Sequence, residues 1–172
     1  AREVQAAIDR LTDRNEKLQT SIEDLTDTIK ASKGTKSVEA YRDAYKYQKE
    51  TNANYLQIAK EQARYSGSHH SWNYYWGGFN QAQIDKLSGQ IGRQWDGNLW
   101  SLSPEEMKAL RSNVDMWTQI QNTGKGGYGG RLTEKLDDYI DQAGKLEELT
   151  DQLYEGLTGI SFDGMYSSFI DN

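Results

Sequence analysis

The most constraining feature of the sequence is an unbroken heptad pattern over residues 4–29. Its core positions alternate in steps of four and three: Val4, Ile8, Leu11, Asn15, Leu18, Ile22, Leu25 and Ile29. This alternation is the core seam of a coiled coil, with the isoleucines and Asn15 at one core position and Val4 and the leucines at the other. One polar residue in such a seam fixes the register of the packed helices at some cost in stability. The pattern therefore predicts a long helix that packs against another helix.

A second long helix is predicted from Val38 to about Tyr65, after a turn at Gly34. If the chain folds back about Gly34, Asn15 faces Asn52, and the two polar core residues share one layer. A short connection between long helices favours an antiparallel hairpin. We therefore expect residues 1–65 to form an antiparallel helical hairpin whose register is set by Asn15 and Asn52.

The heptads then stop, and residues 66–130 form a tryptophan-rich insertion. Two helix-start signals lie in it, each a capping residue followed three positions later by Gln or Glu: Asn80 with Gln83, and Ser103 with Glu106. The first helix is expected to bury Ile84, Leu87, Ile91 and Trp95. The second is expected to bury Met107, Leu110, Val114, Trp117 and Ile120 and to end at Gly124. We expect the tryptophans Trp72, Trp76, Trp95, Trp100 and Trp117 to supply a compact local core.

The helical periodicity returns after the glycine-rich connector 124–130. Residues 131–160 are predicted to form a third long helix on the hairpin, and 161–172 the start of another amphipathic helix. That last stripe stops at Asn172 and the chain begins without Met, so we expect a fragment of a longer protein. The fold class that follows is all-α: an elongated antiparallel coiled-coil hairpin or three-helix bundle with a small Trp-rich helical insertion.

Composition narrows the function classes. The net charge is −6, the pI is about 5.0 and the mean hydropathy is −0.90, so neither nucleic acid nor a membrane is an expected partner. The chain has no cysteine, which excludes disulfides and thiolate chemistry. The carboxylates repeat at the spacing of solvated helix faces, and no Ser, His and Asp set stands out. We expect no enzymatic activity and no cofactor.

Three short motifs resemble ligand sites but lack the residues that such sites need. The pair His69-His70 has no further His or Cys to complete a metal site. Residues 96–99 resemble the middle of a calcium loop, but the loop would end on Ser103 instead of Glu. Residues 124–130 lack the Lys-Ser/Thr ending of a phosphate loop. We therefore expect no bound metal.

The aromatic loop 72–79 is the one ambiguous feature. Trp72, Tyr74, Tyr75 and Trp76 could stack on a glycan or grip a partner protein if they are exposed. If buried, they belong to the core of the insertion, and burial is favoured because Trp and Tyr are usually mostly buried. A helical binding module that uses this loop is the alternative function.

Three segments resemble a bacteriophage tail tape measure protein of the kind carried by prophages: residues 8–25, 102–107 and 154–163. The resemblance touches most of the chain, although none of its motifs is specific, and it carries over no functional residue. It implies a structural, non-enzymatic segment that acts in tail length determination and tail assembly.

The resemblance also implies the partners and the location of the chain. Its partners would be the tail tube and other tail proteins, and its place the virion tail, assembled in the bacterial cytoplasm. Independently of the resemblance, the heptad seam could pair with the same seam of a second copy of the chain.

Overall fold

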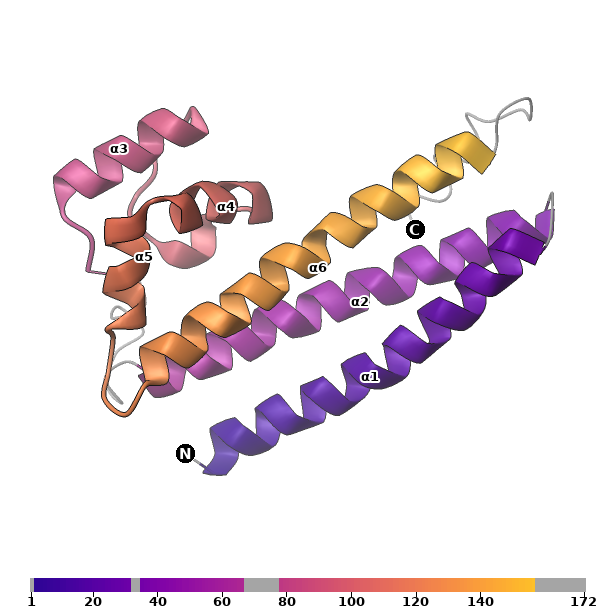
Figure 1. Cartoon of the computed structure of the whole chain (residues 1–172), viewed down its shortest axis with the longest axis horizontal. Coiled ribbons are helices and arrows are strands. Elements are labelled where there is room, and N and C mark those ends of the chain that lie inside the picture. Colours follow the sequence, from indigo (N-terminus) through magenta and orange to yellow (C-terminus); the bar gives the residue numbers. More distant parts are fainter. Residues whose placement is uncertain (1, 32–34, 67–77, 157–172) are drawn as a thin grey trace. The chain divides into compact units, whose positions relative to one another are not determined.

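The computed structural model describes residues 2–31, 35–66 and 78–156, and all of the regular structure in these ranges is helical (Figure 1). The elements are listed here in chain order: α1 (Arg2–Ala31), α2 (Thr35–Ser66), α3 (Gln81–Ile91), the 3₁₀ helix η2 (Leu99–Ser101), α4 (Pro104–Ser112), α5 (Val114–Gln121) and α6 (Tyr128–Gly156). The predicted all-α class, a hairpin or bundle of long helices, is confirmed. The predicted start of a last helix at 161–172 lies outside the described residues.

The chain divides into two compact units. The first, called the core unit here, consists of residues 1–10 and 55–141; the second, the three-helix unit, consists of residues 11–54 and 142–172. This division cuts across α1, α2 and α6, whereas the sequence-based boundaries follow the expected ends of helices.

Hydrogen bonds define how the helices run in the three-helix unit. Arg14 and Asn15 of α1 bond Glu50 and Asn54 of α2, and the short connection after α1 makes this pair antiparallel. Two bonds from α2 to α6, Tyr41 to the Gln152 carbonyl and Gln48 to Gln142, show a second antiparallel pair. The buried apolar residues of the unit are Leu18, Ile22, Val38, Ala40, Tyr41, Ala44, Leu149 and Leu153. They share the interior with the buried polar residues Asn15, Gln48, Thr51 and Asn52.

The core unit has a larger apolar interior. Its contiguous cluster of buried residues comprises Ala59, Ala63, Leu87, Trp95, Leu99, Leu102, Met107, Leu110, Met116, Trp117, Ile120, Leu132, Leu136 and Ile140. Trp100 and Phe79 pack against this cluster, and the Phe79 and Trp95 rings lie 5.6 Å apart between centroids. The predicted tryptophan core is thus confirmed for Trp95, Trp100 and Trp117, while Trp72 and Trp76 lie outside the described residues.

Both helix-start signals of the insertion form the predicted capping boxes. The Asn80 side chain accepts from the Gln83 N–H and the Gln83 side chain accepts from the Asn80 N–H, which opens α3. Ser103 and Glu106 make the same reciprocal bonds at α4, with Pro104 in the first turn. Each box satisfies two N–H groups that a helix start leaves without partners.

The first helix of the insertion is shorter than predicted. It ends at Ile91, because Gly92 adopts a left-handed conformation (φ 75°) that terminates the helix. Trp95 is nevertheless fully buried, although it lies beyond the helix. Its backbone N–H bonds the Ser88 hydroxyl and its indole Nε1 donates to the Asn98 carbonyl.

The prediction of one helix from residue 104 to about 123 was wrong. The helix breaks at Asn113, whose buried side chain donates to the Ala109 carbonyl (2.8 Å) and to Gln90 (2.7 Å). An Asn side chain that bonds the backbone in this way competes with the helical hydrogen bonds. The break rotates Val114 off the buried face, so Val114 is 76% exposed instead of inward-facing.

The third long helix also differs at its start: α6 begins at Tyr128, within the segment predicted to be a glycine-rich connector. Gly129 explains the start, because its backbone lies close to the carbonyl oxygens at the end of α5. A Cβ at this position would meet the carbonyl oxygens of Ile120, Gln121 and Thr123. Only glycine allows this close approach of α6 to α5.

We predict that Gly129→Ala lowers the free energy of unfolding by about 2 kcal/mol, because its methyl group would overlap backbone atoms. Gly130→Ala and Gly144→Ala are matched controls on the same helix, where a Cβ meets nothing within 4 Å. Each control is expected to stabilise the chain by about 0.5–1 kcal/mol, because Ala favours helix over Gly. Urea unfolding measures all three, and a neutral Gly129→Ala would contradict the close approach.

The two units are expected to unfold at different urea concentrations. All five tryptophans fall within residues 55–141, so Trp fluorescence reports the core unit, while far-UV circular dichroism reports helices of both units. Buried polar side chains make up a larger share of the interior of the three-helix unit than of the core unit, so the dichroism should begin to fall at lower urea than the fluorescence. Coincident transitions would instead indicate one cooperative unit.

Candidate functional site

The aromatic residues predicted as a partner-binding surface, Trp72, Tyr74, Tyr75 and Trp76, lie outside the described residues. The pair His69-His70 lies outside them as well. The roles assigned to these side chains therefore stay predictions. The described Phe79 follows Trp76 by three positions and packs with Trp95 within the core unit.

Trp100 is one of three described aromatic side chains with a cation over the ring; the other two are Tyr45 beside Lys49 and Tyr128 beside Arg131. Trp100 is half-buried, and the Lys60 Nζ lies 5.9 Å from its ring centroid, within the range of a cation–π interaction. Its indole Nε1 is buried without a hydrogen-bond partner in the described part of the chain. The contact attaches the end of α2 to the core of the same unit.

A cluster of buried amides in the three-helix unit is the most distinctive polar feature of the described residues. It is called the amide layer here and consists of Asn15 on α1, Gln48, Asn52 and Asn54 on α2, and Gln142 on α6. Asn15, Gln48 and Asn52 are only 5%, 1% and 8% exposed. Buried amides are costly unless their hydrogen bonds are made, so their partners determine what the layer does.

The amides between α2 and α6 are well paired. The Gln48 Nε2 donates to the Asn52 Oδ1 (2.9 Å) and to the Gln142 Oε1 (3.3 Å). Asn52 also has a second amide orientation, in which its Nδ2 donates to the Gln142 carbonyl at 3.1 Å. In either orientation the cluster joins α2 to α6.

Asn15 is paired differently. Its Oδ1 accepts from the Asn54 Nδ2 at 3.0 Å, but its own Nδ2 is buried without a hydrogen-bond partner among the described residues. Glu50 and Asn54, the residues bonded by Arg14 and Asn15, flank Asn52 by two positions on either side. The hydrogen bonds of Asn15 and Asn52 thus go to different partners, and the single layer shared by the two stays a prediction.

One buried face of α2 is not indicated by the sequence pattern. Besides Asn52, which was expected in the core, α2 buries Ala40, Ala44, Gln48 and Thr51, at steps of four, four and three. This spacing is helical, but the residues are small or polar, so no stripe of large apolar residues marks the face. Gln142, which pairs with this face, was missed for the same reason.

Ion pairs connect neighbouring elements of each unit. Arg93 at the end of α3 makes two bonds to Glu106 at the start of α4, at 2.6 and 2.9 Å. The bonds from Arg93, together with the Ser103 N–H, lower the pKa of Glu106 from its ordinary value of 4.5 to about 2. In the three-helix unit, the hydrogen bond from Arg14 lowers the pKa of Glu50.

These arrangements hold helices together, and their chemistry is hydrogen bonding and charge pairing. Within residues 2–31, 35–66 and 78–156, no three His, Asp or Glu side chains are grouped to hold a metal ion. No helix of the described part is long and apolar enough to cross a membrane.

Comparison with known proteins identifies no relative of the chain. No family model, no curated protein and no solved structure matches the chain. Any function has to be inferred from the residues and their geometry.

We predict that Glu106→Gln lowers the thermal midpoint by a few degrees at pH 7, because the charge that pairs with Arg93 is lost. The native pKa is depressed, so the charge stabilises the fold above pH 4.5 and stops doing so as the pH falls towards about 2. The difference between the variant and the unmodified chain should shrink over this range.

The matched control for this measurement is Glu105→Gln. It removes the same charge from the same helical turn, at a side chain that is 74% exposed beside Lys108. Its midpoint should stay close to that of the unmodified chain at every pH. Equal effects of the two substitutions would show that general charge, and not the capping pair, sets the stability.

Proposed function

We propose that the chain is a structural, non-enzymatic segment of a phage tail tape measure protein, acting in tail length determination and tail assembly. The observation that supports this proposal is the length of its helices: α1, α2 and α6 have 30, 32 and 29 residues. At 1.5 Å per residue each could span roughly 45 Å of an extended rod. The resemblance of residues 8–25, 102–107 and 154–163 supplies the class of protein.

A measuring protein converts residue count into length, and this requires helices arranged end to end. The folded three-helix unit would therefore have to open inside the tail. The amide layer favours such opening, because buried amides contribute less to stability than apolar side chains of similar size. The bundle would be the state before assembly, and the extended helices the measuring state.

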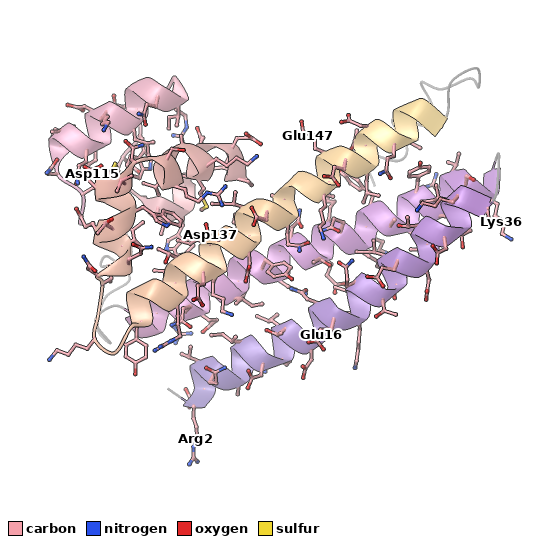
Figure 2. All side chains as sticks on the ribbon, viewed as in Figure 1. Arg2, Glu16, Lys36, Asp115, Asp137 and Glu147 are labelled. Atoms are coloured by element: carbon pink, nitrogen blue, oxygen red, sulfur yellow. The ribbon has the colours of Figure 1, made fainter. Side chains whose placement is uncertain are left out.

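The surface of the helices fits a role based on packing between proteins. Charged side chains such as Glu16 on α1 and Glu147 on α6 are exposed (Figure 2). The proposed partners are the tail tube and other tail proteins, with self-association through the heptad seam of α1. The proposed location is the virion tail, after assembly in the bacterial cytoplasm; nucleic acid and membrane are not proposed as partners of this segment.

The proposal predicts that tail length follows residue number. An in-frame deletion of about 28 helical residues from α1 in the parent protein should shorten tails by roughly 42 Å if the measuring state is a single extended helix. Electron microscopy of purified tails measures the change. Replacement of the same residues by an unrelated heptad sequence of equal length is the control, and it should restore the tail length.

Tails of unchanged length after the deletion would contradict the proposal. If such particles also failed to adsorb to the host, the binding module that uses the aromatic loop 72–79 would become the better account. If the deletion abolished tails altogether, the equal-length replacement would decide whether tail length depends on residue number. Failure of that replacement would also count against a measuring role.

A further inference from the structure

The two helices that flank α2 in the three-helix unit are held by different polar contacts. Towards α6, the Gln48 amide donates to Gln142, and the Tyr41 hydroxyl donates to the Gln152 carbonyl at 3.1 Å. Separation of α6 from α2 would therefore break hydrogen bonds that are already made.

Towards α1, one buried amide is only half-satisfied. Asn15 accepts a bond from Asn54, but its Nδ2 is buried and has no partner within residues 2–31, 35–66 and 78–156. A buried donor without an acceptor destabilises the packed state, because it has lost its hydrogen bonds to water. Separation of α1 from α2 would return water to this group.

The fully buried apolar side chains do not distinguish the two flanking helices. In this unit α1 buries Leu18 and Ile22, and α6 buries Leu149 and Leu153. Each helix also carries half-buried apolar residues: Leu11, Leu25 and Ile29 on α1, and Ala143 and Leu146 on α6. The neighbouring ion pair between Arg14 and Glu50 is also a weak restraint, because its side chains are 51% and 43% exposed and water screens the charges. α1 and α6 therefore differ mainly in whether the buried amides at their contacts with α2 have hydrogen-bond partners.

We propose that α1 is the releasable helix of the three-helix unit: it separates from α2 while α2 and α6 stay paired. The unsatisfied Asn15 amide sets this order, because release of α1 returns water to a donor that lacks a partner, whereas release of α6 breaks hydrogen bonds that are already made. The interpretation of this release as the first step from the bundle to an extended rod rests on the proposed function. The order of release is a property of the chain and holds without it.

Hydrogen–deuterium exchange of the full chain, followed by mass spectrometry, tests the order directly. Exchange under native conditions reports local opening, so faster exchange means easier separation. Peptides from residues 11–31 of α1 should exchange faster than peptides from residues 142–153 of α6. Equal rates, or faster exchange of the α6 peptides, would overturn the proposal whatever the result of the tail-length experiment.

The same Asn→Ala truncation at two positions distinguishes the effect of the unsatisfied amide from the effect of lost packing. Asn15→Ala and Asn52→Ala remove the same side chain at two sites of similar burial, 5% and 8% exposed. Asn52→Ala breaks made hydrogen bonds and should speed exchange of residues 142–153 at least about fivefold. Asn15→Ala removes the unsatisfied donor together with one hydrogen bond, from the half-buried Asn54, which water can replace. Exchange of residues 11–31 should therefore stay unchanged or become slower.

Exchange in residues 104–121 of the core unit is the internal reference and should not change in either variant. Acceleration of residues 11–31 by Asn15→Ala, to the degree that Asn52→Ala accelerates residues 142–153, would overturn the assigned role of Asn15. Loss of folding in Asn15→Ala, seen as lost helical dichroism, would overturn it too, because the amide would then be essential. The order of exchange in the unmodified chain depends on neither variant.

Discussion

The three-helix unit depends on the pairing of amides inside a narrow helical interior. Helices packed this closely leave little room for water, so each buried amide must find its partner on a neighbouring helix. Gln48 does so with the Gln142 side chain, and Asn52 does so with the Gln142 carbonyl in one of its two amide orientations, which fixes how far α6 can slide along α2. An apolar interior would tolerate a slip of one turn more easily, since apolar contacts have no direction. Register is thus specified by a few amides, at some cost in stability.

Much of the fold could be predicted from local patterns. The heptad seam of α1 and the two capping boxes depend on residues within one or two helical turns of each other, and all of them were identified. The break at Asn113 and the early start of α6 at Tyr128 could not be predicted in this way. The first depends on a contact with Gln90, and the second on the carbonyl oxygens of α5 beside Gly129.

The polar interior was predicted only in part. Asn15 and Asn52 interrupt apolar patterns, so they stand out, and both are buried. Gln48 and Thr51 interrupt nothing, because their face of α2 has no large apolar residue to mark it. Burial of such a face becomes evident only when the third helix lies against it. The candidate binding residues of the aromatic loop stay predictions.

The two units also differ in the kinds of contacts that hold them together. The core unit is built from short helices around tryptophans, with local bonds such as those from Arg93 to Glu106. The three-helix unit is long, polar and held by contacts between distant parts of the chain. An apolar interior with short-range bonds and a polar interior with long-range bonds are thus combined in one short sequence.

The bonds of Arg93 have a consequence for the order of folding. Arg93 binds Glu106, 13 residues away, and also the Ser101 carbonyl, so it closes a short loop. The bonds from Gln48 to Gln142 and from Tyr41 to Gln152 span 94 and 111 residues. Short loops close faster than long ones, because less chain entropy is lost. The helices around Arg93 should therefore form a nucleus, and α6 should join α2 only in a later kinetic phase.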